Sequence, residues 1–403
     1  MSVVIATLGF PRLGARGQLA AALSEYWAGR THVALLQQQA ARVRAESWNL
    51  QRQLGVTHIP VNDFTLFDAM LDTSFMLGAI PPEYGWRGGG LDLDLYFSMA
   101  KGASAERERW FDTSHRYVVP RLQSGQQLRL ASTKPFDEFV EAKRIGVHGR
   151  TVLIGPVSFV CLAKREGEAS LDRWLAEVTP IYAEMLRRLA AAGATWVQLD
   201  EPCLADRPHG TLQSAANVCY GALAAAAPEL KLLITACFGP LGDNIEDVMN
   251  LPVAAVHLTA AAAEELSRDS LRVPPHLMLS VGVIDGLSPW RADLSACLAR
   301  IERIAERIGV GRLMLAPTCS LQWLPVDVDA ALSIERDCLE QLAFAKQKVV
   351  ELSVLARALT LGRDSVSAEL KHSDALASAR RRRLPVLDAR VKARLDAIAA
   401  AVD

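Results

Sequence analysis

The order of the expected elements predicts an α/β protein, a (β/α)8 barrel of the TIM type. Three observations support it: eight short apolar runs, a helical segment after each run, and polar residues where several runs end. The expected strands are residues 3–8, 58–63, 152–155, 196–200, 232–237, 254–259, 278–283 and 313–318. The rival fold is a doubly wound open sheet, which usually has fewer strands and a phosphate-binding turn. Neither G-x-G-x-x-G nor G-x-x-x-x-G-K-S/T occurs in this chain.

Helical spacing of apolar residues places helices between these strands. Helices are expected over residues 18–27, 35–54, 64–78, 136–145, 171–192 and 211–226, and around Ile245, Glu264, Leu298 and Leu339. Residues 128–132 are expected to form an added strand.

Two segments interrupt the repeat. Residues 79–127, with Pro81-Pro82 and a run of three glycines, predict an insertion after the second strand that carries its own short helices. Residues 1–359 are therefore expected to be the barrel domain, and residues 360–403 a polar, basic linker that ends in a helix over 388–402. Four consecutive arginines, 380–383, are interpreted as a solvated linker or as a docking surface for an acidic partner or ligand. The terminal helix is expected to pack on the barrel flank or on another chain.

Composition sets the broad class. Half of the 403 residues are hydrophobic, and the formal net charge of −1 gives no electrostatic case for nucleic acid. The seven cysteines are dispersed and form no C-x-x-C pair, which indicates reduced thiols in a cytoplasmic protein. We expect no secretory signal and no membrane partner, because the N-terminus has no basic region before an apolar one and no apolar run reaches about 18 residues.

The strand 196–200 runs into two acids and a proline near the middle of the chain. Alternation places Gln198 and Asp200 on one face of that strand, and Glu201 on the other. The polar strand ends predict a barrel mouth that contains Asp63, Asp200, Glu201 and Asp285. Two interpretations of Asp200 stay open: it holds a cationic or hydroxyl group of a ligand at the mouth, or it forms a buried polar layer with Gln198.

Two further sets of residues suggest binding chemistry. Cys237, His257 and Cys319 lie at strand ends and have side chains that suit zinc, although buried free cysteines are often small apolar fillers. Arg16, before the first helix, and Arg109, before a Trp-Phe pair, are candidates for binding carboxylates, and surface salt bridges are the alternative. Gly17 leaves free amides at that helix start.

Seven segments together resemble cobalamin-independent methionine synthase, in its N-terminal half. They are 7–14 (TLGFPRLG), 26–29 (YWAG), 77–81 (LGAIP), 110–113 (WFDT), 153–157 (LIGPV), 198–202 (QLDEP) and 290–294 (WRADL). The resemblance runs from residue 3 to the end of the chain. It implies one of two barrels in an enzyme that moves a methyl group from 5-methyltetrahydropteroyltriglutamate to homocysteine. The family's zinc and homocysteine sites lie in the other, C-terminal barrel.

The resemblance assigns roles to particular residues. The motif that binds the folate polyglutamate tail corresponds to Arg16, Gly17, Gln18, Leu19 and Ala20, which lack the family's glutamate and lysine, and Arg109 keeps a basic residue before Trp-Phe. Laid on the catalytic barrel, Cys237 and Cys319 fall on two zinc cysteines, His257 lies on the strand of the zinc glutamate, and Asp200 falls on the acid that holds the homocysteine amine. The zinc histidine is replaced by Thr235 and the proton-donating histidine falls near Leu287.

Three hypotheses follow from this resemblance. The chain is the folate-binding half of a split methyltransferase, whose partner is a separate zinc barrel of the C-terminal type. Alternatively, it is a non-catalytic folate-binding or accessory protein, or a lone barrel with its own metal-dependent chemistry around Cys237, His257, Cys319 and Asp200.

Overall fold

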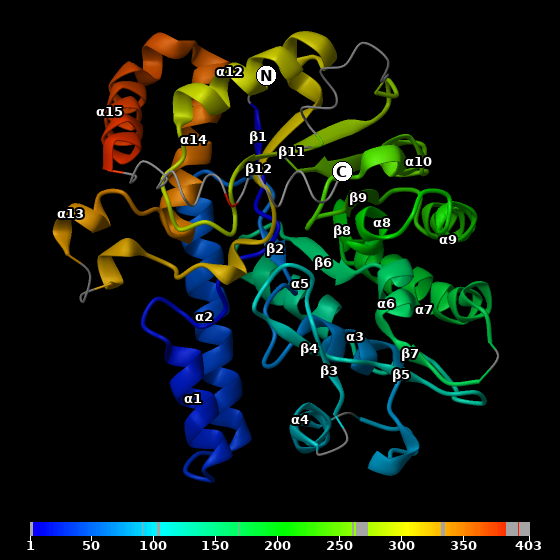
Figure 1. Ribbon diagram of the computed structural model, residues 1–403. Helices are drawn as coiled ribbons and strands as arrows, with labels where there is room; N and C mark the ends of the chain where they lie inside the picture. The colour runs from blue at the N-terminus through cyan, green and yellow to red at the C-terminus, as the bar shows by residue number, and fades with distance from the viewer. Residues whose placement is uncertain are drawn as a thin grey trace.

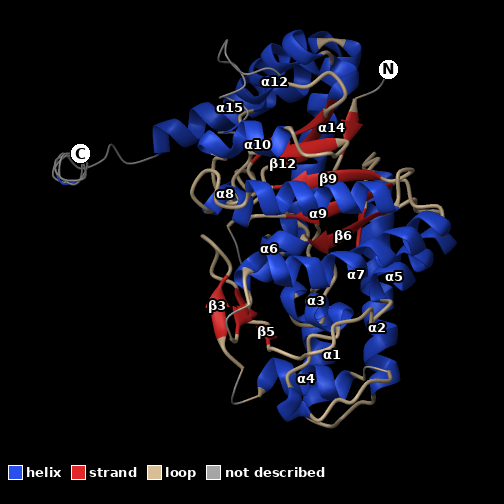
Figure 2. Ribbon diagram, turned by 90° about the vertical axis from the view of Figure 1, so that its right-hand side faces the viewer, coloured by secondary structure: helices blue, strands red, loops and turns tan. Residues whose placement is uncertain are grey.

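A closed parallel sheet forms the centre of the protein. The computed structural model describes residues 3–90, 92–102, 105–167, 169–259, 262, 273–331, 335–383 and 394. Within them, eight parallel strands form one sheet in the order β1-β12-β11-β10-β9-β8-β6-β2. A parallel bridge between Ala6 and His58 joins the two outer strands of this order, so the sheet curls on itself with helices around it (Figures 1 and 2). The prediction of a (β/α)8 barrel is confirmed.

Each expected barrel strand is present. They are β1 (Val4–Ile5), β2 (Pro60–Val61), β6 (Arg150–Ile154), β8 (Trp196–Asp200), β9 (Lys231–Thr235), β10 (Ala255–Leu258), β11 (Met278–Ile284) and β12 (Leu313–Pro317). The central strand β8 has the predicted bounds, with Pro202 and a short helix directly after it. β1 and β2 are shorter than predicted because the chain soon leaves the ladder toward the barrel mouth.

Helices cover the outside of the sheet. Those of the barrel layer are α3 (Ala69–Leu77), α5 (Lys134–Arg144), α6 (Pro156–Leu162), α7 (Leu171–Ala191), α8 (Cys203–Asp206), α9 (Gln213–Ala226), α10 (Ile245–Met249), α12 (Leu294–Ile308) and α14 (Ala345–Leu361). The helix predicted around Leu339 is only α13 (Arg336–Leu339), and α14 is the long helix after β12. Most of the helix predicted around Glu264 lies outside the described residues.

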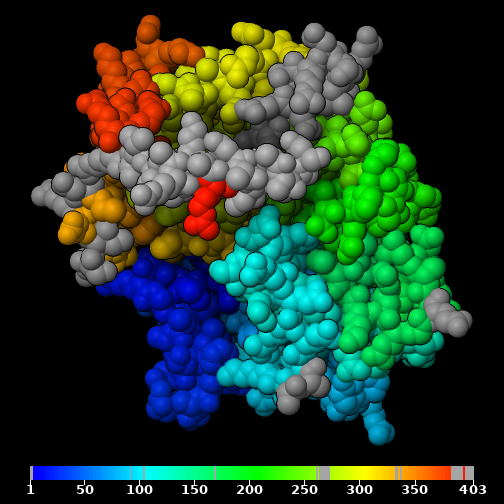
Figure 3. Space-filling model, in the orientation of Figure 1, coloured from blue at the N-terminus to red at the C-terminus, as the bar shows by residue number. Residues whose placement is uncertain are grey.

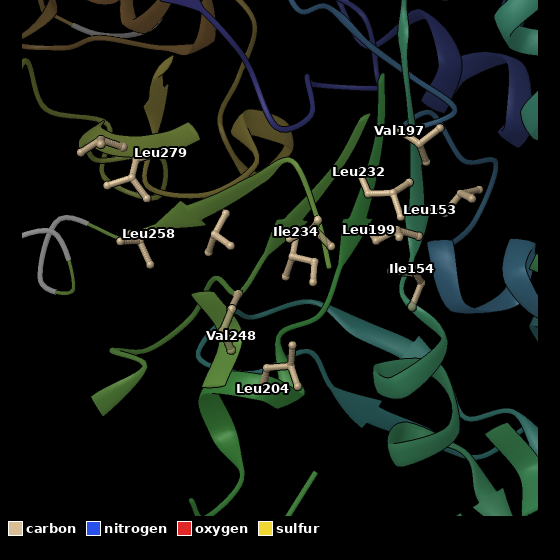
Figure 4. Close-up of a cluster of buried hydrophobic side chains, with 14 of the residues drawn as sticks. Leu153, Ile154, Val197, Leu199, Leu204, Leu232, Ile234, Val248, Leu258 and Leu279 are labelled. Atoms are coloured by element: carbon tan, nitrogen blue, oxygen red, sulfur yellow. The ribbon is translucent and has the colours of Figure 1, made fainter. Parts of the chain in front are cut away.

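The apolar face of each strand packs against these helices, as alternation requires. Figure 4 shows this cluster, which includes Leu153, Ile154, Val197, Leu199, Leu204, Leu232, Ile234, Val248, Leu258 and Leu279. The inside of the barrel has a separate apolar layer of Trp196, Leu233, Ala255 and Met314. Polar side chains lie elsewhere inside the barrel, and they form the site described below.

The insertion contains more β-structure than predicted. It has η1 (Pro82–Tyr84) and α4 (Leu93–Lys101), whose N-cap Asp92 accepts a hydrogen bond from the Leu95 amide at 2.7 Å. It also has an antiparallel pair, β3 (Arg107–Arg109) with β4 (Arg116–Val118), and β5 (Arg121–Leu122), which pairs with β7 (Lys164–Arg165). In Figure 3 this cyan region stands between the blue N-terminal helices and the green half of the barrel.

The strand predicted over residues 128–132 is absent from this described segment. The Arg129 and Ala131 amides instead donate to the Leu77 and Met76 carbonyls at the end of α3, at 3.0 and 2.9 Å. The segment is extended, but its hydrogen-bond partners belong to a helix end, so no ladder forms.

Two helices at the N-terminus form a hairpin, α1 (Gln18–Trp27) with α2 (Val33–Gln53), which extends away from the sheet (Figure 1). α1 starts at Gly17, which has a φ of 71°. Leu19 and Leu36 are fully buried in a second core that the hairpin shares with α3 and α4.

The segment predicted as a linker is helical and packed. After α14 come η6 (Arg363–Val366) and α15 (Ser367–Arg383). Leu370, Ser373 and Ala377 form a buried stripe on α15 despite its polar composition. The Ser373 hydroxyl donates to the Ala292 carbonyl at 3.1 Å and accepts from the Leu294 amide at 3.0 Å, which ties α15 to the start of α12. The helix predicted over 388–402 lies outside the described residues, Arg394 apart.

Candidate functional site

The carboxyl ends of four neighbouring strands open into a pocket, here called the mouth pocket. Its cavity volume is about 90 Å³. The walls come from the ends of β2, β6, β8 and β9, the loop after β12, helices α3 and α5, and the β3–β4 insertion. Its polar lining residues include Arg12, Asn62, Asp63, Asp68, Asp72, His115, Lys134, Gln198, Asp200 and Thr235. In barrels of this kind, ligands bind at this end of the sheet.

Asp200 joins the mouth pocket to a polar network inside the barrel. Its Oδ1 accepts hydrogen bonds from Gln198 Nε2 at 2.6 Å and from the Thr235 hydroxyl at 2.5 Å. Gln198 Oε1 in turn accepts from Arg150, whose guanidinium also donates to the Thr7 carbonyl at 2.6 Å. Burial raises the pKa of Asp200 to about 6, although both hydrogen bonds and Arg150 favour the charged form. Both interpretations of Asp200 therefore describe its position: it belongs to a buried layer and it lines the mouth.

Glu201 does not line the mouth pocket, so its predicted placement at the mouth is corrected. It is fully buried, and it accepts hydrogen bonds from the Val157 and Ser158 amides at 3.1 and 2.6 Å. The Tyr220 hydroxyl donates to it at 2.7 Å. The carboxyl group therefore caps the start of α6 in the layer behind the sheet, as strand alternation requires. Burial raises the pKa of Glu201 to about 7.

Two more aspartates are held by backbone amides at the rim. Asp63 accepts from the Phe10 amide at 2.8 Å, and Asp68 accepts from the Leu71 and Val118 amides at 2.8 and 3.0 Å. Asp68 thereby caps α3 and ties it to β4. Burial raises the pKa of Asp63 and that of Asp68 to about 7. With Asp200, the mouth pocket therefore contains three carboxyl groups whose pKa is raised by burial.

Lys134, at the start of α5, neutralises part of this acidic group. Its ammonium donates to Asn62 Oδ1 and to the Phe64 carbonyl, both at 2.8 Å. It also forms ion pairs with Asp72 and with the buried Glu138, both at 3.2 Å. One cation therefore joins the end of β2 to helices α3 and α5.

Aromatic rings form the outer wall. Phe111 and Phe238 stack with centroids 5.5 Å apart and planes within 5°, and Trp110 packs edge-on against both. The left-handed backbone residues other than glycine, among those described, are Asn62, Phe111 and Phe238, with φ of 65°, 44° and 77°. Such conformations cost free energy and gather at functional sites. Here two of the three line the pocket and the third stacks on its wall.

Of the other predicted site residues, Cys237 lines the mouth pocket, whereas Arg16, Arg109 and Asp285 lie outside it. Arg16 is exposed in the turn before α1, where its amide donates to Gln18 Oε1 at 2.9 Å, and Leu19 is a core residue. Arg109 is exposed on β3, next to the pocket residue Trp110. Asp285 follows β11, and its Oδ1 accepts from the Leu287 and Ser288 amides at 2.9 and 3.1 Å.

The three metal candidates do not fit zinc. His257 Nδ1 contacts the Ser280 hydroxyl at 2.9 Å, and Nε2 contacts the Thr318 carbonyl at 3.2 Å, so both ring nitrogens are engaged. Burial raises the pKa of Cys237 well above its usual range and that of Cys319 to about 12. Cys237 and Cys319 pack with Ala6, Leu8 and Ala316 as small apolar residues. Nowhere in the described chain do three or more His, Cys, Asp or Glu side chains gather as a metal site would need.

Sequence reasoning missed several pocket residues. Asp68 precedes an apolar helix, which is an N-cap signal, and it was open to prediction. Arg12, Asp72 and Lys134 had no local signal, because tertiary folding alone brings the loop after β1 and helices α3 and α5 together. His115 and Trp323, with ring centroids 5.1 Å apart, come from the insertion and from the loop after β12.

The fold and the pocket define the class: a (β/α)8 barrel with an aromatic and charged pocket at the carboxyl ends of its strands. The model of the cobalamin-independent synthase N-terminal domain matches residues 4–309. The chain belongs to this family.

Curated relatives are similar in sequence along nearly the whole chain. A protein of Caulobacter vibrioides named 5-methyltetrahydropteroyltriglutamate–homocysteine methyltransferase is 45% identical, over 99% of this chain and 54% of its own length. A protein of the same name from Nitrobacter winogradskyi is 42% identical, over 98% and 54%. The chain thus spans about half the length of these relatives.

Solved structures show the same fold. A B12-independent methionine synthase of a Shewanella species, in complex with selenomethionine, has a TM-score of 0.60 at 13% identity, over 91% of this chain and all of that one. A putative vitamin-B12-independent methionine synthase of Listeria monocytogenes has a TM-score of 0.58 at 14% identity, over 90% and 98%. In the described residues, no helix combines the length and the apolar character that crossing a bilayer requires.

Proposed function

We propose that this chain is the folate-binding half of a 5-methyltetrahydropteroyltriglutamate–homocysteine methyltransferase in methionine biosynthesis, and that it works with a separate barrel that carries zinc. The observation that carries the proposal is the 45% identity to one half of such an enzyme along 99% of this chain. Ligands of (β/α)8 barrels bind at the carboxyl ends of the strands, so the mouth pocket is the place to look for the ligand.

The geometry of the mouth pocket supports a folate. A pterin is a flat ring with N–H donors, and the aromatic wall offers stacking while Asp63 and Asp200 offer acceptors. Arg16 and Arg109 are exposed arginines outside the pocket, suited to the carboxylates of a polyglutamate tail. The donors at Cys237, His257 and Cys319 do not fit zinc, so the proposal assigns zinc and thiol activation to the other barrel.

Reconstitution tests the catalytic part. The purified chain is mixed with a zinc barrel of the C-terminal type from its own source, and methyl transfer from 5-methyltetrahydropteroyltriglutamate to homocysteine is followed. We expect activity from the mixture and none from either chain alone. Failure of every such pair to associate, or a mixture no more active than the zinc barrel, would overturn the split-enzyme proposal.

Calorimetry tests the binding part. We expect pteroyltriglutamate to bind more tightly than pteroylmonoglutamate, and Arg16→Ala and Arg109→Ala each to reduce that difference by roughly tenfold, since a hydrogen bond to a charged group contributes about 1.5–3 kcal/mol. The control is Arg173→Ala, an exposed arginine on α7 that pairs with Glu177. Absence of heat with either ligand would contradict folate binding. Binding without methyl transfer in any mixture would instead support the accessory-protein alternative.

A further inference from the structure

A second cavity lies at the other half of the barrel mouth and is not used by the proposed function. It has a volume of about 590 Å³ and lies where β11 ends, between the start of α12 and helices α14 and α15. We call it the basic cavity, and its charged lining residues are Asp285, Arg291, Asp293, Arg300, Lys348 and Arg380.

Three cations of the basic cavity contact backbone carbonyls. Arg291 Nε donates to the Glu340 carbonyl at 2.9 Å, Lys348 Nζ to the Trp290 carbonyl at 2.5 Å, and Arg380 Nη1 to the Arg291 carbonyl at 2.8 Å. None of the three has a carboxylate within 4.0 Å in the part of the chain that the structure describes. Lys348 is only 1% exposed, so its ammonium has lost water, and the buried Glu351 on the same helix acts on it only from beyond 4.0 Å.

The nearby acids are already engaged. Asp285 accepts two backbone amides, while Asp293 caps α12 through the Ala296 amide at 3.1 Å and pairs with Arg381 at 3.2 Å. Glu351 lies behind the cavity and accepts from the Ala292 amide at 3.2 Å. Burial raises the pKa of Glu351 to about 7, although Lys348, Arg291 and Arg380 favour its charged form. Four basic residues and two acidic residues line the cavity, so its lining has an excess of positive charge in a chain whose net charge is −1.

We infer that the basic cavity is a binding site for a compact oxyanion with two or more negative charges, a phosphate group or a small polycarboxylate. The two guanidinium groups keep N–H donors beyond the single one each gives to a carbonyl, and planar guanidinium groups match such oxygens in pairs. Lys348 supplies a buried point charge that a bound anion would neutralise. This assigns a role to Arg380 of the four-arginine run. The inference does not depend on folate binding.

The test is calorimetry of the whole chain with inorganic phosphate, citrate and glycerol phosphate, at constant ionic strength set by sodium chloride. We expect saturable binding of at least one of the three and none of acetate. Arg291→Gln and Arg380→Gln should each weaken it roughly tenfold, the effect of losing one hydrogen bond between charged groups. The matched control is Arg382→Gln, an exposed arginine on the same helix that does not line the cavity.

The three probes separate the sources of the anion. Binding of glycerol phosphate as well as phosphate indicates a phosphate ester, and binding of citrate alone indicates a polycarboxylate. The inference is overturned if no probe binds saturably, or if the Arg291 and Arg380 variants bind as well as the Arg382 variant. Unchanged pteroyltriglutamate binding in these variants would show that anion binding in the basic cavity is independent of folate binding in the mouth pocket.

Discussion

The two halves of the barrel mouth hold their charges in different ways. In the mouth pocket, Lys134 pairs with Asp72 and Glu138, and the remaining aspartates accept hydrogen bonds from backbone amides or neutral side chains. Arg12 is the exception there, because it donates to the Thr65 carbonyl at 2.8 Å. In the basic cavity, Arg291, Lys348 and Arg380 donate to backbone carbonyls and have no carboxylate within 4.0 Å among the described residues. Both sites lie at the carboxyl ends of barrel strands. They differ in whether their charged side chains have partners of opposite charge.

This difference separates structural charges from charges available to a ligand. When one member of a buried ion pair is replaced by a neutral residue, the other member stays buried without an opposite charge, and the fold is destabilised. A buried cation that has no nearby anion already destabilises the folded protein through its lost hydration, and a bound anion can offset that cost. Substitutions in the two sites therefore test the comparison directly.

The largest effect is expected for Lys134→Met. The change leaves Asp72 without a cation within 4.0 Å among the described residues, and it leaves the buried Glu138 with Arg44 alone, at 3.7 Å. Removing one partner of a buried pair typically costs about 3–5 kcal/mol. Urea unfolding followed by circular dichroism measures the loss. The control is Lys164→Met, whose exposed pair with Glu106 should contribute little. Equal stability of the two variants would show that Lys134 is not structural.

The barrel, and the strand at its centre, could be predicted from the sequence because periodicity is local. Alternation along residues 196–200 correctly placed Asp200 on the inside, and the same rule, applied one residue further, sends Glu201 to the helix layer. Its placement at the mouth followed from chain proximity alone and was wrong. Residues 128–132 had the composition of a strand but met a helix end instead of a neighbouring strand.

Much of the candidate site could not be predicted, because its residues meet only through tertiary folding. Lys134 and Asp72 are far apart in the chain and carry no shared motif, and the basic cavity depends on α15 packing against α12. Residues 360–403 were interpreted as a polar, basic linker with a terminal helix because residues 360–379 are polar and rich in alanine, yet Leu370 and Ala377 are buried. The burial of these side chains depends on the surface of α12 against which α15 packs, and that surface comes from a distant part of the sequence.

A smaller effect is expected from Asp200→Asn, through pH. A folded-state pKa of about 6, above the usual 3.8, means that the native state binds more protons than the unfolded state between those values, so stability falls as pH rises through this window. Between pH 4 and pH 7, the free energy of unfolding of the wild type should fall by about 2 kcal/mol more than that of Asp200→Asn. This figure is smaller than the full pKa shift would give, because Asp200 is partly exposed. Thermal unfolding across this range measures the difference. Parallel curves for the two proteins would contradict the raised pKa.

The smallest effect is expected from Lys348→Met, the counterpart of Lys134→Met in the basic cavity. Methionine fills the space of the lysine stem and removes an ammonium that has no carboxylate within 4.0 Å among the described residues, at the cost of one hydrogen bond to the Trp290 carbonyl. These terms oppose each other, so the stability should change by about 1 kcal/mol or less. Lys346→Met, on the same helix, removes a partly exposed pair with Asp327 and serves as the control.

The decisive measurement for Lys348→Met is urea unfolding with and without the anion that binds the wild type. The variant should keep its stability in plain buffer and lose most of the stabilisation that the anion gives, because it lacks the buried charge. A loss in plain buffer as large as that of Lys134→Met would mean that Glu351 or another group compensates Lys348 within the fold. The two halves of the mouth would then hold their charges in the same way, and the contrast between them would fail.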